Sequence, residues 1–374
     1  MSSSPVIIYR YDASPYSVKV DNILVLKNIP HQKVNVLPVL PRPEITDLLG
    51  ITYRRIPILA IGNDVYCDTS LIASALERRF PASAGYGTIF PKVKNGGGAV
   101  TGLAKASSKL YDTALFPHAA NLLPWEKFPP AFLKDRSLVC SYRLYMSLIL
   151  ADPPYQLSGT TIKVEAVNAA REASLTALSA HLVSTHSPVE IVNQFQLTPF
   201  KSLLEEQFQD GREYLFDTEQ PSLADASAHF ILSWVRASRP GKALVDASNF
   251  PHTVKASPIR PHPDKRGENH KRGSQPVPKR VTGEEAAASI VSSSYEPYDV
   301  VGFNVPEAAR LSLKLNDQVQ IAPDDTGRDY PTVGKLVGIS RDEVVIEVQG
   351  SKGLLRCHFP RLGFTVKAVQ PHKL

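Results

Sequence analysis

The sequence predicts three folded regions in the order α/β, all-helical and all-β. Strand and helix patterns alternate over residues 5–80, only helical patterns follow from about 95 to 255, and short strands separated by turn residues fill about 296–370. A chain of 374 residues is long enough for two or three domains. We therefore expect four segments: an α/β domain at 1–85, a helical domain at 95–254, a linker at 255–295 and a small β domain at 296–374.

The first region reads as β-α-β-α-β-β-α. "VIIYRY" predicts a buried strand, and "SPYSVKVDNILVLKNI" has apolar residues at near-helical spacing up to Pro30. "KVNVLPV" predicts a second strand and "EITDLLG" a short helix that ends at Gly50. "IPILAIGNDVY" predicts a hairpin whose turn is supplied by Gly62 and Asn63, and "DTSLIASALERRF" predicts the closing helix.

The middle region is helical, with "ALSAHL", "FKSLLEEQF" and "SLADASAHFILSWVRA" as its clearest pieces. The last piece begins with a capping box in which Ser222 is the N-cap and Asp225 replaces the usual glutamate. Segments 142–156 and 183–196 break the helical pattern, and we interpret them as insertions. In the third region, "DQVQIAP", "TVGKLVGI", "DEVVIEV", "LLRCHF" and "FTVKAV" predict a small antiparallel barrel of the SH3-like type.

The net charge of +6 is concentrated in one segment. Residues 255–280 contain eight Lys and Arg against two acids and are rich in proline, which is typical of a basic linker. The three cysteines, Cys67, Cys140 and Cys357, are far apart in the sequence, so we expect no disulfide framework and no metal site. The chain has no apolar run long enough for a membrane helix and no secretory signal, so we expect a cytoplasmic protein.

Four motifs, in order, resemble those of the glutathione S-transferase family. They are "SPYSVKV" as the serine-type opening, "RRIPIL" as the cis-proline loop, "YCDTSLI" in place of an acid–alcohol pair, and "PSLADASA" as the cap of a helix in the second domain. The resemblance covers about residues 5–250 and implies a thioredoxin-like domain followed by the all-α domain of that family. Together with "GKLVGISRDEVVIEV" and "CHFPRLGF", the whole chain is similar to fungal transferase-like proteins with an added C-terminal domain.

The resemblance implies that Ser14 activates glutathione, with Ser17 as the second choice for this role. A thiol with a pKa near 8.5 is only a few per cent ionised at neutral pH, so its pKa must fall by about two units, roughly 2.7 kcal/mol. A hydroxyl that donates to the sulfur anion supplies about 1.5–3 kcal/mol, and a helix N-terminus adds about 0.3–1 kcal/mol. These residues need no metal for this. Taken alone, Ser14 is also consistent with a simple N-cap.

Further positions follow from the same resemblance. Ile56, before a cis Pro57, pairs its backbone with glutathione, while Asp68 and Thr69 receive the γ-glutamyl group, with Thr69 as a helix N-cap. Without the family, this is an ordinary X-Pro turn and a capped helix. The candidates for the glycyl carboxylate are the basic residues Arg42, Arg54, Arg55 and Lys33, although surface arginines are usually solvated. The candidates for an electrophile pocket, more often core residues at helical spacing, are Tyr111, Phe116, His118 and Trp125.

The function we expect is glutathione transfer to an electrophilic small molecule, or glutathione-assisted isomerisation or elimination, in detoxification or secondary metabolism. Glutathione is then the co-substrate, the partners are small molecules rather than a membrane or nucleic acid, and the family implies a homodimer. Two alternatives stay open. One is a scaffold that binds without turnover. The other is an adaptor that binds a protein or nucleic acid through the basic linker and the β domain.

Overall fold

The structure of the protein is a computed structural model, and it describes residues 4–137, 208, 210–237, 242 and 278–369. The chain divides into two compact units. Residues 1–84, 131–160 and 274–374 form the first, which we call the sheet unit, and residues 85–130 and 161–273 form the second, the helical unit.

The described part of the sheet unit contains ten strands. They are β1 (Val6–Arg10), β2 (Gln32–Asn35), β3 (Ile58–Ile61), β4 (Asp64–Cys67), β5 (Lys279–Arg280), β6 (Gln318–Pro323), β7 (Thr332–Ile339), β8 (Glu343–Gly350), β9 (Gly353–Pro360) and β10 (Phe364–Ala368). Its helices are α1 (Pro15–Leu26), α2 (Pro43–Thr46), α3 (Thr69–Arg79), α6 (Pro130–Ser137), α12 (Gly283–Val291), α13 (Tyr298–Val301) and α14 (Val305–Arg310), with a 3₁₀ turn at Ala82–Ala84. The predicted N-terminal order is thus present, including the β3–β4 hairpin.

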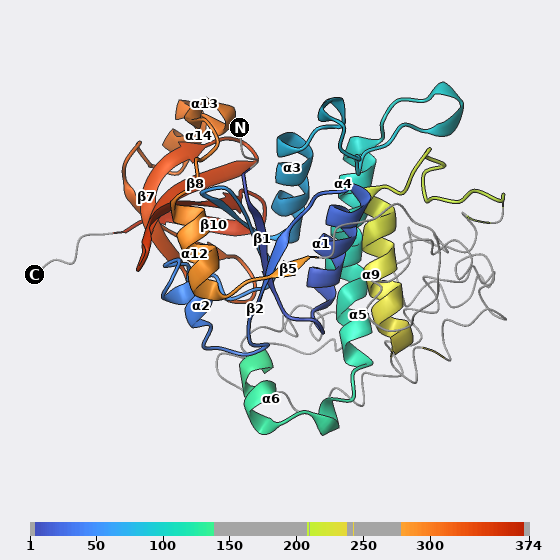
Figure 1. The fold of residues 1–374 in the computed structure, drawn as a ribbon, viewed down its shortest axis with the longest axis horizontal. Coiled ribbons are helices and arrows are strands. Elements are labelled where there is room, and N and C mark those ends of the chain that lie inside the picture. The colour runs from blue at the N-terminus through green and yellow to red at the C-terminus, as the bar shows by residue number, and fades with distance from the viewer. Residues whose placement is uncertain (1–3, 138–207, 209, 238–241, 243–277, 370–374) are drawn as a thin grey trace, which may run out of the picture. The chain divides into compact units, whose positions relative to one another are not determined.

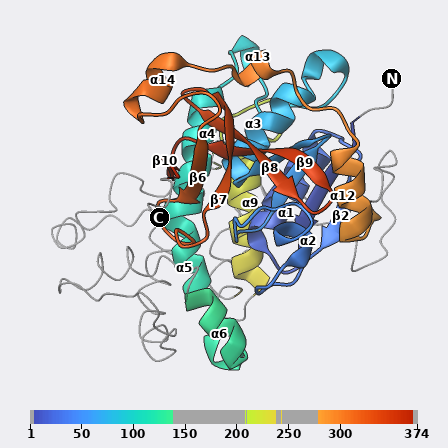
Figure 2. The same cartoon turned by 90° about the vertical axis from the view of Figure 1, so that its left-hand side faces the viewer.

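All ten strands belong to one sheet, in the order β10-β6-β7-β8-β9-β4-β3-β1-β2-β5 (Figures 1 and 2). The five strands predicted for the C-terminal region are all present and antiparallel. They do not stand apart as the sequence led us to expect. Among the described residues, β9 pairs with β4 in parallel rather than with β10, so the C-terminal strands extend the N-terminal sheet.

The backbones of the N-terminal and C-terminal parts of the chain pack closely against each other at this junction. A side chain at Gly50 would collide with the carbonyl oxygen of Gln349, and one at Gly62 would collide with that of Ser294. Both glycines have positive φ angles, 69° and 64°, which other residues rarely adopt. The two N-terminal turns are therefore shaped to receive the C-terminal chain.

Helices cover both faces of the N-terminal part of the sheet. In Figure 1, α1 and α3 lie on one side of β1, and α2 and α12 lie on the other. The core on the second side combines N-terminal and C-terminal residues, for example Ile45 and Leu49 with Ala286 and Ile290. Burial of such apolar surface is the main stabilising term of folding, so one core serves both ends of the chain.

The predicted linker at 255–295 differs from the structure at its C-terminal end. Lys279 and Arg280 form β5 beside β2, and α12 follows with a complete capping box between Thr282 and Glu285. Three of its apolar side chains are buried: Ala286, Ala287 and Ile290. An amphipathic helix with this cap is stable only when its apolar face is covered, and here the sheet unit covers it.

The described part of the helical unit is built on α4 (Thr101–Leu110), α5 (Phe116–Asn121) and α9 (Leu223–Ala237), with a π-helical turn, η3 (Tyr111–Leu115), between the first two. Short 3₁₀ turns occupy Lys94–Gly96 and Trp125–Lys127. The predicted capping box of α9 is confirmed. The backbone N–H of Ser222 donates to Asp225 at 2.8 Å, and the N–H of Asp225 donates to Ser222 Oγ at 3.4 Å.

Several predictions fall on residues outside the described part: the helical pieces 177–182 and 200–207, the insertions at 142–156 and 183–196, Cys140, and most of the basic linker. Cys67 and Cys357 are buried free thiols whose Sγ atoms are 3.7 Å apart, although 290 positions separate them. None of the described helices has the length and hydropathy needed to span a membrane.

Candidate functional site

Three of the predicted site segments lie at one end of the sheet. In the ladders, Tyr9 of β1 is paired with Ile58 of β3, and Ile58 is paired with Cys67 of β4. Ser14 follows the end of β1, Ile56 and Pro57 precede the start of β3, and Asp68 follows the end of β4. Because β3 is antiparallel to both of its neighbours, these positions lie at the same end of the three strands β1, β3 and β4. The resemblance requires this arrangement.

Ser14 is the N-cap of α1, with Pro15 in the first turn. Its Oγ accepts a hydrogen bond of 3.3 Å from the backbone N–H of Ser17, and only 3% of Ser14 is exposed. The cap uses a lone pair of Ser14 and leaves the hydroxyl proton available to an acceptor. Ser17 is fully buried, and its own Oγ has no partner among the described residues.

The Ile56–Pro57 bond is cis, as the resemblance implies. Ile56 lies just outside the β1–β3 ladder, which ends at Ile58. In the described part of the chain, the backbone N–H and C=O of Ile56 have no hydrogen-bond partner. The backbone N–H and C=O of Ile56 are therefore available to pair with an extended peptide.

Asp68 has φ 75° and ψ 136°, a conformation that an aspartate seldom adopts. It is the N-cap of α3, and its Oδ1 accepts from the N–H of Ser70 at 2.9 Å and from Ser70 Oγ at 2.5 Å. The predicted N-cap was Thr69, one residue later; Thr69 is instead the first helical residue and is buried. Such backbone strain is typical of functional positions. The conformation of Asp68 places its carboxylate at the N-terminus of α3.

Arg55 is anchored by the C-terminal region. Its Nη2 donates to the side chain of Asp325, to the backbone oxygen of Thr326 at 2.5 Å and to Thr326 Oγ1 at 2.7 Å. Burial alone would lower the pKa of Arg55, but Tyr53, Asp325 and the nearby Asp68 raise it above its usual value. Arg55 thus remains a cation at neutral pH.

The other basic candidates have different surroundings. The guanidinium of Arg42 is buried and donates to the backbone oxygens of Leu37 (2.7 Å), Pro38 (2.9 Å) and Arg54, and burial lowers its pKa to about 10. Arg54 forms an ion pair of 2.9 Å with Asp135. Both residues are occupied in holding the chain together. Lys33 is buried in β2.

The aromatic candidates of the helical unit are mostly core residues. Tyr111, His118 and Trp125 are buried, and the indole of Trp125 donates to the backbone oxygen of Ala120 at 2.9 Å. Phe116 stacks on Trp234 with 5.3 Å between ring centroids. These contacts match the core interpretation of the helical spacing.

A buried cluster of charges at the β4–β9 junction was not predicted. Asp64, fully buried, accepts from His358 Nε2 at 2.9 Å, Arg356 Nε at 2.9 Å and Arg79 Nη1 at 3.0 Å. His358 also contacts Glu343 through Nδ1 at 2.6 Å. We call these residues, together with Arg78 and Glu296, the junction cluster; Arg78 forms ion pairs with Glu296 (2.8 Å) and Glu343 (3.1 Å).

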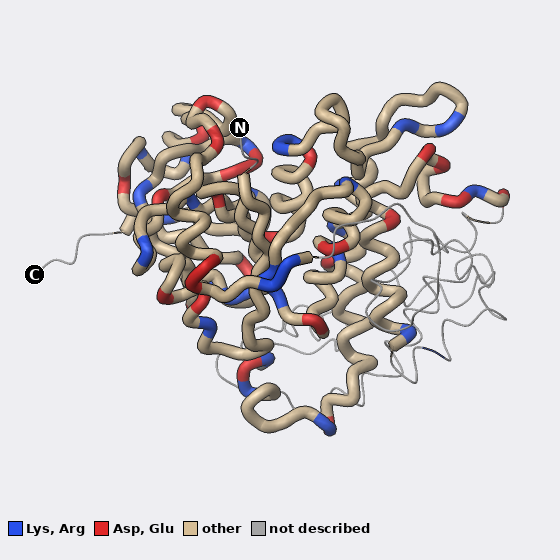
Figure 3. The backbone as a smooth tube through the Cα atoms, in the orientation of Figure 1, with Lys and Arg blue, Asp and Glu red and all other residues tan. Residues whose placement is uncertain are grey.

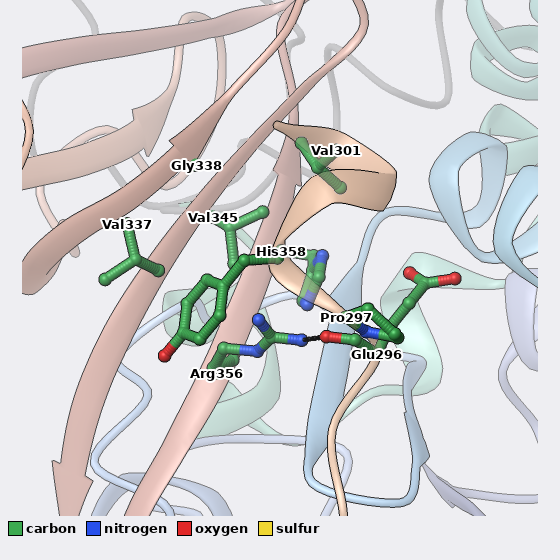
Figure 4. Close-up of a pocket in the computed structure, with 9 residues that line it drawn as sticks. Glu296, Pro297, Val301, Val337, Gly338, Val345, Arg356 and His358 are labelled. Carbon is green, nitrogen blue, oxygen red and sulfur yellow. Dashed lines mark hydrogen bonds between the residues drawn. The ribbon is translucent and has the colours of Figure 1, made fainter. Parts of the chain in front are cut away.

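Figure 4 shows His358, Arg356 and Glu296 beside a small hollow that Val301, Val337 and Val345 also line. Arg356 donates to the backbone oxygen of Glu296. Within the described residues, no group of His, Cys, Asp and Glu has the arrangement of a metal site. The hydrogen bonds and ion pairs of the cluster connect β4, β8, β9 and the segment before α13.

The junction cluster makes the stability of the sheet unit depend on pH. Burial alone would lower the pKa of His358, but Asp64 and Glu343 raise it above its usual value. Burial alone would raise the pKa values of Asp64 and Glu343, but His358 lowers both, assisted by Arg356 and by Arg78 respectively. His358 therefore contributes stability that is complete below about pH 6.5 and is lost as the pH rises through its raised pKa. The carboxylates contribute stability that is lost at acid pH, as the pH falls through their lowered values.

We expect the urea midpoint of the wild-type protein to fall as the pH rises from about 6.5 through the alkaline range. The His358→Gln variant has no imidazolium to lose, so its midpoint should change much less over the same range. Urea unfolding at a series of pH values, followed by circular dichroism, makes this comparison. Parallel pH profiles for the two proteins would contradict the assignment of the titration to His358.

Two family models match parts of the sequence. Residues 8–84 match the family model described as the glutathione S-transferase N-terminal domain, and residues 149–256 match a model described as a domain of unknown function. No curated protein matches the sequence.

Among solved structures, a GST-like protein from Pseudomonas syringae is similar with a TM-score of 0.62 and 21% identity, covering 98% of this chain and 100% of the other. A rice GST in complex with glutathione has a TM-score of 0.42 and 12% identity over 69% of this chain and 87% of its own. A tau-class glutathione S-transferase from mango has a TM-score of 0.39 and 13% identity over 68% and 86%. The protein thus has the fold of a GST-like protein, and its residues 8–84 are similar to the glutathione S-transferase N-terminal domain.

Proposed function

We propose that the protein binds glutathione at the edge formed by Ser14, Ile56 and Asp68 and activates its thiol for reaction with an electrophilic small molecule. The observation that carries this proposal is the ladder register, which places the ends of β1 and β4 and the start of β3 together. That register brings three groups to the same end of β1, β3 and β4: a helix-capping hydroxyl, a backbone segment without hydrogen-bond partners among the described residues, and a carboxylate. These are the groups needed for a thiol, a peptide backbone and an ammonium group.

Ser14 is the proposed thiolate donor. Its hydroxyl proton is free of the cap bond, so it can donate to a sulfur anion at the N-terminus of α1. The helix is twelve residues long, and its N-terminal N–H groups favour negative charge there. Bound glutathione releases its thiol proton to solvent, and the thiolate forms a new bond to the electrophilic carbon. In a substitution the leaving group departs with the electron pair of its bond to that carbon, and in an addition the electron pair of a double bond moves away from it and later takes up a proton. The protein itself needs only to stabilise the anion.

The binding groups divide among the remaining residues. Ile56 offers its backbone N–H and C=O to the cysteinyl unit, and Asp68 offers a carboxylate to the γ-glutamyl ammonium, with the Thr69 hydroxyl beside it. Arg55 carries its positive charge nearby for a carboxylate of the peptide. Arg42 has a structural role instead, because its guanidinium is already used by three backbone oxygens.

The enzyme type, the reaction class, the cellular process and the oligomeric state are part of the same proposal. We propose a serine-type enzyme, similar to fungal relatives, that conjugates an electrophile or assists its isomerisation or elimination. Detoxification and secondary metabolism are the processes that use such chemistry. We further propose a cytoplasmic homodimer and an SH3-like curvature for strands β6 to β10, whose first and last members are adjacent.

Isothermal titration with glutathione, followed by a conjugation assay with 1-chloro-2,4-dinitrobenzene, tests this function. We expect saturable binding and turnover above the uncatalysed rate, both reduced in Asp68→Ala. Glycine or free cysteine at the same concentration is the matched control and should not bind. Absence of glutathione binding would overturn the proposal.

The alternatives predict other outcomes. A scaffold without turnover would bind glutathione without acceleration of the reaction. The adaptor would depend on the basic linker at 255–280, most of which lies outside the described residues. β5 carries two adjacent cations, Lys279 and Arg280, but elsewhere in the described chain basic and acidic residues are interspersed (Figure 3). Nucleic-acid binding relies on a basic patch, so retention on nucleic acid would support the adaptor instead.

A further inference from the structure

The loop between β6 and β7, residues 324–331, and Thr332, the first residue of β7, contact the chain just before the cis-proline. Thr52 Oγ1 donates to the backbone oxygen of Pro331 at 2.6 Å, and the backbone N–H of Tyr53 donates to Thr332 Oγ1 at 3.1 Å. The Arg54 guanidinium lies 4.7 Å from the centre of the Tyr330 ring. Arg55 follows with its bonds to Asp325 and Thr326. Four consecutive residues that lead into Ile56 are therefore held by the β6–β7 loop and the adjoining Thr332.

The hydrogen bonds of Arg55 to the β6–β7 loop involve only one of its three guanidinium nitrogens. All three hydrogen bonds leave from Nη2, while Nε and Nη1 have no partner in the described part of the chain. A guanidinium offers a planar fork of donors, so one occupied nitrogen fixes the plane and leaves the other donors for a carboxylate. The Arg55 side chain is 24% exposed and that of Asp325 is 55% exposed. An ion pair this exposed adds little to folding stability.

We propose that the β6–β7 loop is a positioning element of the glutathione site, in which Asp325 and Thr326 orient Arg55 to bind a carboxylate of the peptide. This inference rests on the proposed function and adds to it a role for the C-terminal region. Fixing a long side chain before the ligand arrives removes an entropy cost from binding. Gly327 allows the close approach: its φ is +83°, and a Cβ there would come within 3.2 Å of Arg54 Cγ.

Asp325 can either compete with the ligand for Arg55 or hold Arg55 in position. These two roles predict opposite changes in glutathione affinity when Asp325 is replaced. If Asp325 only competed with the ligand for Arg55, Asp325→Asn would bind glutathione more tightly. If it positions Arg55, the same variant binds more weakly, by about 3- to 10-fold for one long side chain that is no longer ordered in advance. Thr326→Val removes one acceptor without changing charge, so positioning predicts weaker binding there too.

The test is isothermal titration of the full-length variants with glutathione. We expect weaker binding in Asp325→Asn and Thr326→Val at unchanged urea midpoints, and no further loss when Asp325→Asn is added to Arg55→Gln. Asp329→Asn, a charge change at an exposed position of the same loop, is the matched control and should bind like the wild type. Tighter or unchanged binding in Asp325→Asn, or an equal loss in Asp329→Asn, would overturn the inference while leaving the proposed function intact.

Two further arms complete the experiment. γ-Glutamylcysteine lacks the glycyl carboxylate. If Arg55 binds that carboxylate in glutathione, Asp325→Asn should bind γ-glutamylcysteine as tightly as the wild type does. If the loss persists, Arg55 holds the γ-glutamyl carboxylate, and the positioning role stands in either case. A wild-type protein that binds no glutathione would overturn the proposed function and this inference with it.

Discussion

Replacing Ser14 by alanine is expected to lower the rate of glutathione conjugation at neutral pH by about 10- to 100-fold, because the variant loses a charge-assisted hydrogen bond worth about 1.5–3 kcal/mol. Binding of glutathione should change much less, since the other groups of the peptide keep their partners. Steady-state kinetics with a chlorinated nitroaromatic substrate separates the two effects: kcat should fall while KM for glutathione stays within a few-fold.

Two variants control this result. Ser14→Thr keeps a hydroxyl at the cap and should retain most of the activity. Ser17→Ala removes a hydroxyl that is fully buried and unpaired among the described residues, so we expect little effect on the rate. Ser14→Ala also loses a helix cap worth about 0.5–2 kcal/mol, which urea unfolding measures separately. Wild-type kcat in Ser14→Ala, or a loss confined to Ser17→Ala, would contradict the assignment of Ser14.

The Asp64→Asn substitution is expected to destabilise the sheet unit by about 3–5 kcal/mol, the cost of removing one partner from a buried ion pair. Asp64 is fully buried and accepts from His358, Arg356 and Arg79, so its loss leaves buried cations without their carboxylate. The amide is almost the same size, so packing changes little. Urea unfolding followed by fluorescence gives the free energy of unfolding of the variant and of the wild type.

Asp325→Asn provides the contrast, because it breaks an ion pair to arginine that is partly exposed. Such pairs are worth about 0–1 kcal/mol, so this variant should unfold close to the wild type. The structural account requires a large difference between the two variants. If Asp64→Asn lost no more stability than Asp325→Asn, the junction cluster would not be what joins the C-terminal strands to β4.

Much of the local structure could be predicted from the sequence. The cap at Ser14, the Gly62–Asn63 hairpin, the box of Ser222 and Asp225 and all five C-terminal strands depend on neighbouring residues, and local patterns record them. Motifs also identified the candidate positions after β1 and β4 and before β3, and the strand register places these positions at the same end of the three strands. The helix at 283–291 was missed although Thr282 and Glu285 give a capping-box signal directly before an apolar run.

The joining of the two ends of the chain could not be predicted, since strand pairing between distant segments leaves no local pattern. Cys67 and Cys357 looked unrelated because 290 residues separate them, yet their sulfurs are 3.7 Å apart. Asp64, Arg356 and His358 did give a signal. They are charged or titratable residues within apolar strands, and a buried charge needs a partner. The sequence indicates that such partners exist, but only the pairing of β4 with β9 shows which residues they are.

The most direct test of a hydroxyl-stabilised thiolate is a pH titration of the ultraviolet thiolate absorbance of glutathione bound to the wild type and to Ser14→Ala. We expect the bound thiol to ionise about two pH units lower in the wild type than free in solution, and most of that shift to be lost in the variant. The same thiol pKa in both proteins, or a pKa equal to that of free glutathione in the wild type, would contradict the role of Ser14.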